Sequence, residues 1–196
     1  MKIIIIGGGF AGLKLARLLG IKEGIEVLLI DKRNYHQFQP LFYQVATAGL
    51  DASNISFPLR KIFQNSPNLQ FRLAEVKRID APNQKVVTNI GDFNYDQLVI
   101  ATGAYTNFFN NQQVQQNAFS MKTTEEALLL RYKLIQNFED ALIAKDYDAA
   151  ALQKLMNIVV VGAGPTGVEV CGALAEMRNN VLPKDYPDLD FKKMHI

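Results

Sequence analysis

The sequence predicts an α/β fold in which parallel strands are covered by helices. Two observations support this prediction. The first is the order of a short, wholly apolar, β-branched run, a glycine-rich loop and a helical segment at residues 3–19. The second is that the same order occurs again at residues 158–178. Such apolar runs are typical of central parallel strands that are buried on both faces. A repeated strand, glycine loop and helix is typical of nucleotide-binding units of the Rossmann type.

The first glycine loop follows the predicted strand at residues 3–6 and fits G-x-G-x-x-G at positions 7, 9 and 12. Gly7 would allow the tight turn, Gly9 would let the backbone approach a pyrophosphate, and Gly12 would let helix and strand pack closely. The helical segment 11–19 would then place its N-terminus at the phosphates, where free N–H groups and the helix dipole favour negative charge.

An acidic residue follows at the expected interval. A second apolar strand, residues 26–30, ends at Asp31, 19 positions after Gly12. Its carboxylate can accept hydrogen bonds from ribose hydroxyls and would repel a 2′-phosphate. The glycines alone would fit a flexible turn, but the ordered set of strand, loop, helix and acid predicts a dinucleotide site.

Residues 34–50 are rich in aromatic and amide side chains and have neither a strand nor a helix period. Such a segment fits the wall of a site for a flat, partly apolar ligand, or an aromatic loop packed on the core. The order N-Y-H at 34–36, F-Q-P-L at 38–41 and Y-Q-V-A at 43–46 resembles the signature of type II NADH:quinone oxidoreductases, which are single-subunit and do not pump protons. The resemblance runs along nearly the whole chain.

The resemblance implies an α/β, FAD/NAD(P)-binding Rossmann-type fold, that of a two-dinucleotide-binding-domain flavoprotein, truncated within the second Rossmann unit. We expect residues 1–120 to form the N-terminal portion of an FAD-binding domain. Residues 121–196 would form a connecting helix and the incomplete start of an NADH-binding domain. The implied activity is hydride transfer from NADH to FAD, followed by two-electron reduction of a membrane quinone.

By this resemblance the first glycine loop and Asp31 would hold the ADP half of FAD, and residues 39–47 would lie beside the isoalloxazine and the quinone path. Pro40 would fix that loop by locking its own φ. We expect His36 to make a structural hydrogen bond. The residues expected to bind FAD are Gly7, Gly9, Phe10, Ala11, Gly12, Asp31, Lys32, Gln39, Pro40, Gln44, Thr47, Val76, Ala101, Thr102 and Gly103.

In the middle of the chain, the pattern of apolar residues predicts strands at 71–76, 85–88 and 95–100, and a short amphipathic helix at 57–63. The last strand enters A-T-G at 101–103, which resembles the motif where two-dinucleotide flavoproteins bring backbone against the cofactor. In flavoproteins of this class a residue like Val76 meets the adenine through its backbone, although by itself Val76 fits a core valine.

Residues 107–116 are rich in Asn and Gln and predict a surface crossing. Thr123, with Glu126 three positions later, forms a capping-box pattern, and the apolar positions beyond it predict a helix over 124–144.

The second glycine loop follows the predicted strand 158–161 and precedes a helix over 168–178. Two nucleotide loops in one chain argue for two ligands that exchange electrons, such as FAD with NAD(P)H. Glu169 resembles a family glutamate near the flavin and quinone that is proposed to relay protons; alone it would be a favourable helix N-terminal carboxylate. Gln44 and Glu169 are the catalytic candidates. The residues expected at the NADH site are Gly162, Gly164, Pro165, Thr166, Gly167 and Glu169.

No second strand with its own acidic end follows this loop. Residues 179–190 predict a loop, and we reject Asp188 and Asp190 as ribose ligands because no apolar strand precedes them. We therefore expect the chain to be the N-terminal part of a longer enzyme.

Composition limits the remaining classes. The 196 residues are 48% hydrophobic and 20% charged with a formal net charge of +2, which is typical of a soluble globular protein and disfavours a nucleic-acid partner. The single cysteine, Cys171, is expected to be a packing residue. A single cysteine excludes both a multi-cysteine metal site and the cysteine pair of a disulfide reductase. A ferredoxin reductase-like enzyme and an inactive FAD-domain fragment remain alternatives.

The resemblance also implies partners and location. NADH and quinone would be the substrates, and a C-terminal region absent from this sequence would attach the full-length protein to the cytoplasmic side of the bacterial inner membrane. A homodimer is a further expectation. The 196-residue chain itself is expected to be soluble and cytoplasmic.

Overall fold

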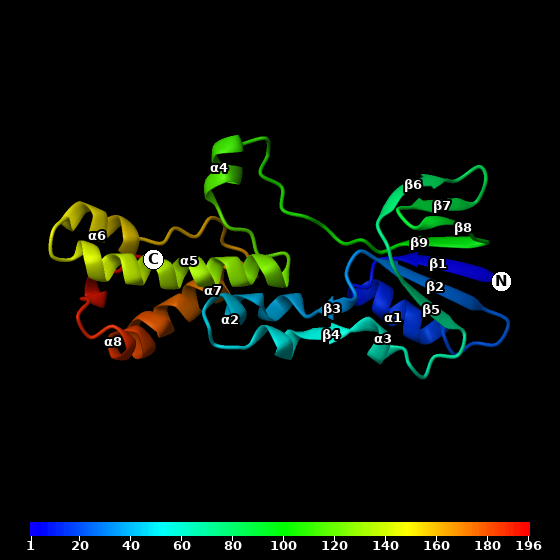
Figure 1. Cartoon of the computed structure of the whole chain (residues 1–196), viewed down its shortest axis with the longest axis horizontal. Coiled ribbons are helices and arrows are strands. Elements are labelled where there is room, and N and C mark those ends of the chain that lie inside the picture. Colours follow the sequence, from blue (N-terminus) through cyan, green and yellow to red (C-terminus); the bar gives the residue numbers. More distant parts are fainter. The chain divides into compact units, whose positions relative to one another are not determined.

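The computed structural model describes residues 1–196 and resolves into two compact units, shown in Figure 1. Unit 1 comprises Met1–Gln37 and Ser56–Tyr105, and unit 2 comprises Phe38–Ile55 and Thr106–Ile196. The predicted α/β fold with a parallel sheet is confirmed. The ligand-binding domains expected at 1–120 and 121–196 stay a prediction, since compactness alone does not identify what a unit binds.

A four-stranded parallel sheet forms the centre of unit 1, with strand order β5-β2-β1-β9. Its strands are β1 (Lys2–Ile6), β2 (Glu26–Asp31), β5 (Leu69–Leu73) and β9 (Gln97–Ile100). Successive side chains of β1 point to opposite faces: Ile3 and Ile5 pack in one apolar cluster, and Ile4 and Ile6 in another. The predicted burial of β1 on both faces is therefore confirmed.

Different elements cover the two faces of this sheet. The cluster around Ile5 includes residues of helices α1 (Phe10–Leu19) and α3 (Leu59–Ile62). The cluster around Ile4 includes Val86 of a three-stranded antiparallel sheet formed by β6 (Val76–Asp80), β7 (Lys85–Thr88) and β8 (Gly91–Asn94). The parallel sheet lies between a helical layer and a second sheet.

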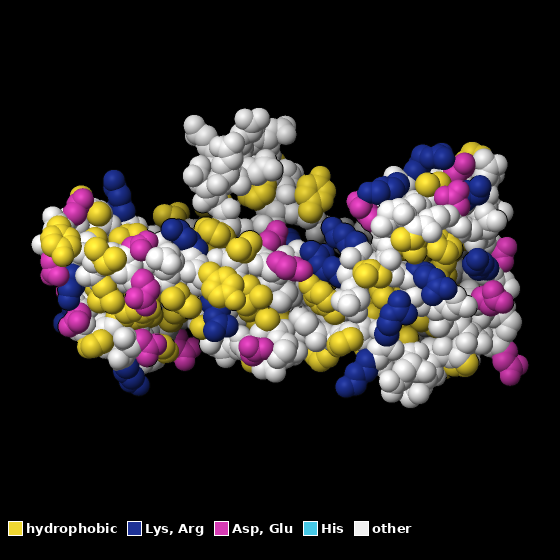
Figure 2. Space-filling view, viewed as in Figure 1, with side chains coloured by type: hydrophobic (Ala, Val, Ile, Leu, Met, Phe, Trp, Pro, Cys, Tyr) yellow, Lys and Arg dark blue, Asp and Glu magenta, His cyan; other side chains and the backbone are white.

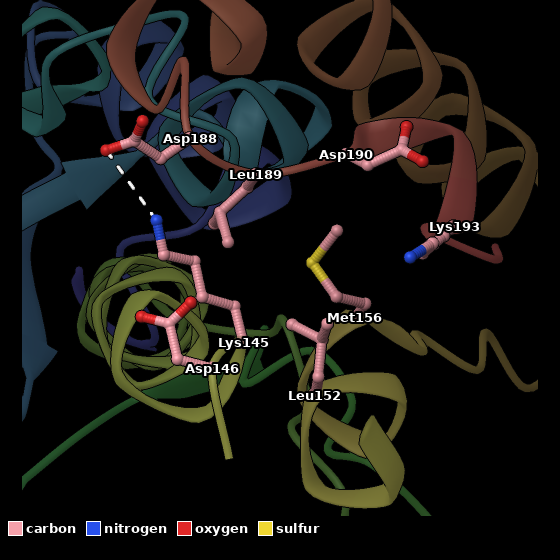
Figure 3. Close-up of a pocket in the computed structure, with 8 residues that line it drawn as sticks. All are labelled: Lys145, Asp146, Leu152, Met156, Asp188, Leu189, Asp190 and Lys193. Carbon is pink, nitrogen blue, oxygen red and sulfur yellow. Dashed lines mark ion pairs between the residues drawn. The ribbon is translucent and has the colours of Figure 1, made fainter. Parts of the chain in front are cut away.

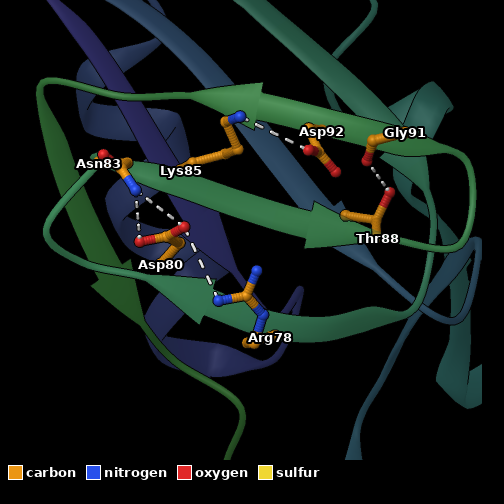
Figure 4. Close-up of polar contacts among 7 residues, drawn as sticks. All are labelled: Arg78, Asp80, Asn83, Lys85, Thr88, Gly91 and Asp92. Carbon is orange, nitrogen blue, oxygen red and sulfur yellow. Dashed lines mark hydrogen bonds and ion pairs between the residues drawn. The ribbon is translucent and has the colours of Figure 1, made fainter.

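Polar contacts fix the two turns of the three-stranded sheet (Figure 4). At the β6–β7 turn, both carboxylate oxygens of Asp80 accept hydrogen bonds from Asn83 Nδ2 at 3.1 Å. The bond from Asn83 holds the pKa of Asp80 below its ordinary value. At the β7–β8 turn, the Thr88 hydroxyl donates to the Gly91 carbonyl oxygen at 2.6 Å.

Two predicted elements of unit 1 are wrong. The strand predicted at 71–76 is two strands, because the chain leaves the parallel sheet after Leu73. The next amides bond elsewhere: Ala74 N–H donates to the Asp31 carbonyl at 2.9 Å, and Glu75 N–H donates to Asn89 Oδ1 at 2.7 Å. The helix predicted at 57–63 begins only at α3, because Ser56–Pro58 forms strand β4 and pairs antiparallel with β3 (Tyr35–Gln37).

Unit 2 is helical. Its helices are α2 (Phe42–Ala46), α4 (Gln112–Asn117), α5 (Thr124–Ala144), α6 (Ala149–Met156), α7 (Pro165–Glu176) and α8 (Leu182–Asp185), with a π-helical turn at Met177–Val181. Short 3₁₀ helices lie at Gln39–Leu41, Ala52–Ile55 and Phe191–Lys193. The largest apolar cluster of this unit includes Phe138 of α5, Met156 of α6 and Leu174 of α7. A second cluster joins α2 to the start of α5 through Val45 and Ala127.

Helix α5 has the bounds and the cap that the sequence predicts. The Thr123 hydroxyl accepts the Glu126 N–H at 3.1 Å, and the Glu126 carboxylate reaches back to the Lys122 N–H at 2.6 Å. In a capping box this second bond goes to the cap residue itself. Here it reaches one residue further out, to the amide of the residue that precedes the cap.

We expect Thr123→Ala to lower the free energy of unfolding by about 1 kcal/mol, because it removes the cap of a helix that packs against two others. Thr123→Ser should retain the stability, since it keeps the hydroxyl. Urea denaturation followed by circular dichroism measures both. Asn111→Ala, which removes the exposed cap of the short helix α4, is the control and should change little. A serine variant as unstable as the alanine variant would show that the hydroxyl is not the cap.

Three predicted elements of unit 2 differ from the structure. Residues 158–161 form no strand, because the bridge next to them joins only Asn157 to His195. Val159 and Val161 are each 84% exposed. The surface crossing at 107–116 ends in the short helix α4. The loop predicted at 179–190 contains the π-helical turn and α8, because Leu182 is buried and anchors that helix.

Charged side chains are mixed on the surface. On the face shown in Figure 2, Lys and Arg are interspersed with Asp and Glu. None of the helices combines the length and the hydropathy needed to cross a membrane.

Candidate functional site

The first glycine loop lies at the carboxyl edge of the parallel sheet, where ligands of open α/β sheets bind. Gly7 has φ +108°, and a Cβ at this position would overlap the Ala101 carbonyl. A Cβ on Gly12 would overlap the Gly7 carbonyl oxygen. Only glycine fits both positions, because backbone occupies the space on their Cβ side.

Gly9 differs from these two glycines because its Cβ side is open. It is the N-cap of α1 with φ −71° and ψ −169°, and no atom lies within 4 Å of a Cβ placed there. Gly9, Phe10 and Ala11 are exposed, and the first turn of α1 carries no acidic residue. The N-terminus of α1 can therefore receive an anion.

Asp31 is joined to the loop by hydrogen bonds. Its Oδ2 accepts the Gly8 N–H at 2.5 Å, and its Oδ1 accepts the Arg33 N–H at 2.8 Å. Each oxygen keeps a further lone pair, so both can also accept a hydroxyl donor such as a ribose.

A pocket of about 320 Å³ opens beside this carboxylate. It is large enough for part of a nucleotide. Predicted site residues from four distant parts of the chain meet there, namely Gly7, Asp31 with Lys32, Val76, and Thr102. The full lining is Ile6, Gly7, Ile30, Asp31, Lys32, Arg33, Ala74, Glu75, Val76 and Thr102.

Two charged residues of this pocket are absent from the sequence-based set. Arg33 directly follows the predicted site residue Lys32, and Glu75 directly precedes Val76. This adjacency in the sequence is the only signal that could have indicated them. Glu75 pairs with Lys77 at 2.6 Å, and this contact lowers the pKa of the Glu75 carboxyl, with a smaller contribution from the charge of Lys32. The carboxylate therefore stays ionised at neutral pH.

The A-T-G segment lies next to the same loop. Ala101 N–H donates to the Ile6 carbonyl at 2.8 Å, which extends the β1–β9 pairing by one residue, and Ala101 is the residue whose carbonyl meets Gly7. Gly103 has φ +70° with open space on its Cβ side. The backbone conformation at Gly103 favours glycine.

The predicted residues between 39 and 47 belong to unit 2 and do not line this pocket. Gln39 and Pro40 are exposed in a 3₁₀ turn. Gln44 Nε2 donates to the Tyr43 hydroxyl at 3.1 Å, and the Thr47 hydroxyl donates to the Tyr43 carbonyl at 2.9 Å. Their place beside a flavin stays a prediction.

The second glycine loop repeats the backbone of the first. Gly162 has φ +111°, Gly164 is the N-cap of α7 with φ −73° and ψ 175°, and a Cβ on Gly167 would overlap the Gly162 carbonyl oxygen. Pro165 is in the first helical turn, where its missing N–H costs nothing. Thr166 is exposed. The loop keeps its shape although no strand precedes it, so the glycine pattern itself fixes the local geometry.

Glu169 is exposed as the fifth residue of α7. Its interpretation as a helix N-terminal carboxylate is wrong, because the first turn of α7 carries no acidic residue and the dipole effect is confined to that turn. The two rejected aspartates have other contacts: Asp188 lies 3.8 Å from Lys145, and Asp190 caps the last 3₁₀ helix.

A second pocket, of about 300 Å³, lies within unit 2 (Figure 3). It contains none of the predicted site residues. Asp146, Asp188 and Asp190 face Lys145 and Lys193 around an apolar floor. It is distinct from the second glycine loop, whose residues do not line it.

Sequence comparison agrees with this geometry. Residues 1–183 match the family described as pyridine nucleotide-disulphide oxidoreductase. The chain belongs to this family. Among curated proteins, it is 38% identical over 185 residues to the type II NADH:quinone oxidoreductase NdhA of Mycobacterium tuberculosis, and 36% identical over 199 residues to Ndh of the same organism. The resemblance to type II enzymes found in the sequence is thereby confirmed.

A solved structure of the same kind extends the comparison. NDH2 of Plasmodium falciparum, in complex with RYL-552, superimposes on 98% of the chain with a TM-score of 0.89 and 29% sequence identity. The chain covers 40% of that structure, and 39% and 42% of the two mycobacterial proteins. It therefore spans about two-fifths of the length of the relatives that it matches.

Proposed function

We propose that the chain is the FAD-binding part, and the beginning of the NADH-binding part, of an NADH:quinone oxidoreductase. The observation that carries this proposal is the pocket in which Gly7, Asp31, Val76 and Thr102 meet at the carboxyl edge of the parallel sheet. The names of the relatives, which are NADH:quinone oxidoreductases, support the choice of substrates.

The residues of the first loop fit the ADP half of FAD. The exposed N-terminus of α1, beside the open Cβ side of Gly9, would bind the pyrophosphate, Asp31 would accept the ribose hydroxyls, and the pocket wall at Val76 would receive the adenine. When bound, FAD supplies a two-electron acceptor that takes hydride from NADH and passes electrons to a quinone.

The second loop would bind the pyrophosphate of NADH at the N-terminus of α7, because its backbone repeats that of the first loop. Glu169 would exchange protons, and Gln39, Pro40, Gln44 and Thr47 would lie on the flavin side. Attachment to the cytoplasmic side of a membrane and a homodimer belong to the same proposal. The one cysteine of the chain cannot form the cysteine pair that disulfide chemistry needs.

The whole gene product is expected to purify with FAD and to oxidise NADH only when a soluble quinone analogue is present. Flavin absorbance, chromatography of the released cofactor and the NADH absorbance decay measure this. Residues 1–196 alone should show no steady turnover, since they hold only the start of the second nucleotide unit. Purified protein without flavin, or one that reduces ferredoxin but no quinone, would contradict the proposal.

A further inference from the structure

Side chains hold both backbone polar groups of Gly8 in the first glycine loop. The Gly8 N–H donates to Asp31 Oδ2 at 2.5 Å, and the Gly8 carbonyl oxygen lies 2.9 Å from His36 Nδ1. A carbonyl oxygen can only accept, so this contact is a hydrogen bond when Nδ1 carries the proton. Gly8 itself is buried, and a Cβ there would press on Leu59 and on Asp31.

The imidazole that makes this bond is fixed by packing. His36 is 5% exposed and lies in β3, opposite Phe57 of β4. Its ring meets the ring of Phe10 edge to face, with centroids 5.1 Å apart and planes at 82°. Phe10 is the first residue of α1. The ring therefore contacts the glycine loop at the Gly8 carbonyl and also contacts the start of the helix that follows.

The second loop shows that this contact is not needed for the loop shape. The residue that corresponds to Gly8 there is Ala163, which is exposed, and no side chain of the chain hydrogen-bonds that loop. The glycine geometry of the two loops is nevertheless the same. The glycine geometry of the first loop therefore does not depend on His36, and the contact of His36 can only restrict the motion of Gly8 within a loop that forms without it.

We propose that His36 is a positioning residue for the dinucleotide. Its Nδ1–H holds the Gly8–Gly9 peptide through the Gly8 carbonyl, and Asp31 accepts the N–H of the preceding Gly7–Gly8 peptide. With Gly8 held on both sides, the carboxylate stays oriented for a ribose. Binding then costs less ordering, because the groups that receive the ligand are already in place. This inference rests on the proposed binding of FAD at the first loop.

Two variants separate the hydrogen bond from the packing. His36→Asn keeps a donor close to the position of Nδ1 but removes the ring, whereas His36→Phe keeps the ring against Phe10 but has no donor. We expect His36→Phe to weaken FAD binding about tenfold, or 1.4 kcal/mol, and His36→Asn to stay within about threefold of the wild type. Titration of the apo form of the whole gene product with FAD, followed by flavin fluorescence, gives the dissociation constants.

Thermal unfolding of the apo variants shows whether each is folded before titration. A His36→Phe variant that binds FAD like the wild type would overturn the inference, and so would a His36→Asn variant as weak as His36→Phe. Nitrogen-15 NMR of the apo protein gives a readout that needs no FAD: the Nδ1–H tautomer is expected, and a bare Nδ1 contradicts the contact. Wild-type protein that binds no FAD would refute the proposed function as well. If the wild type binds FAD and His36→Phe has the same dissociation constant, only the role of His36 is refuted.

Discussion

Gly12→Ala is expected to disrupt the first glycine loop and to destabilise the protein, whereas Gly9→Ala should leave the fold intact and weaken FAD binding. Gly12 is buried, and an added Cβ would overlap the Gly7 carbonyl oxygen and meet the Ile5 side chain at 3.4 Å. The Gly7 carbonyl cannot move away easily, because Gly7 is itself confined by Ala101. Overpacking of this kind costs about 1–3 kcal/mol.

Gly9 provides the matched control at the same loop. Its φ of −71° suits any residue, and no atom lies within 4 Å of an added Cβ. Alanine therefore causes no clash in the apo protein, but its methyl group would occupy the space proposed for the pyrophosphate. We expect the free energy of unfolding to change by less than about 0.5 kcal/mol, as for an ordinary surface substitution. The FAD dissociation constant should rise at least about tenfold, which corresponds to 1.4 kcal/mol of lost contact.

Urea denaturation and FAD titration of the two variants test this difference. A Gly12→Ala variant as stable as the wild type would show that the loop has another backbone path. A Gly9→Ala variant with normal FAD affinity would show that the phosphates do not lie at the N-terminus of α1.

Asp31→Ala is expected to weaken FAD binding about 100-fold. Hydrogen bonds to a charged group contribute about 1.5–3 kcal/mol each, and two ribose hydroxyls would lose their acceptor. The variant also loses the acceptor of the Gly8 and Arg33 amides, so the apo protein should become less stable by about 1 kcal/mol. Asp31→Asn should give a smaller loss in affinity, because its amide oxygen can still accept one hydroxyl.

Asp92→Asn is the control for the two Asp31 variants. Asp92 lies in the same unit on β8, exposed and 3.7 Å from Lys85, and it is outside the pocket. Removal of its charge should leave FAD affinity unchanged, since exposed ion pairs contribute little. Equal affinities for the wild type and Asp31→Ala would place the ribose elsewhere, and an equal loss in Asp92→Asn would indicate a general effect of negative charge.

The parts of the fold that the sequence predicts correctly are those decided by near neighbours in the chain. In both glycine loops the third glycine approaches the carbonyl of the first, Gly12 at Gly7 and Gly167 at Gly162, and this close contact forms whether or not a strand precedes the loop. Helix α5 depends on Thr123 and Glu126 in the same way.

The missed parts depend on distant partners. The predicted strand 71–76 divides because the Glu75 amide bonds to Asn89, and β4 replaces the start of a predicted helix because β3 pairs with it. The predicted strand 158–161 stays unpaired because a parallel strand needs neighbours, and here only Asn157 bridges to His195. None of these partners can be identified from local pattern.

Some residues of the candidate site could likewise be predicted from the sequence, and others could not. Gly7, Asp31 and Thr102 lie at or just after the carboxyl ends of neighbouring parallel strands, so their meeting could be expected from topology. Arg33 and Glu75 enter the pocket through side-chain directions that the sequence does not reveal. The hydrogen bond of His36 was expected, but its partner, the Gly8 carbonyl, was visible only in the structure.

The most direct test of the central claim, that the first glycine loop binds the ADP half of FAD, is a titration of the apo whole gene product with FAD and with FMN. FMN carries the same isoalloxazine but lacks the adenosine and the second phosphate. We expect FAD to bind at least about 100-fold more tightly than FMN, or 2.7 kcal/mol, and Gly9→Ala to remove most of this difference. Equal affinities for FAD and FMN would contradict the assignment of the loop.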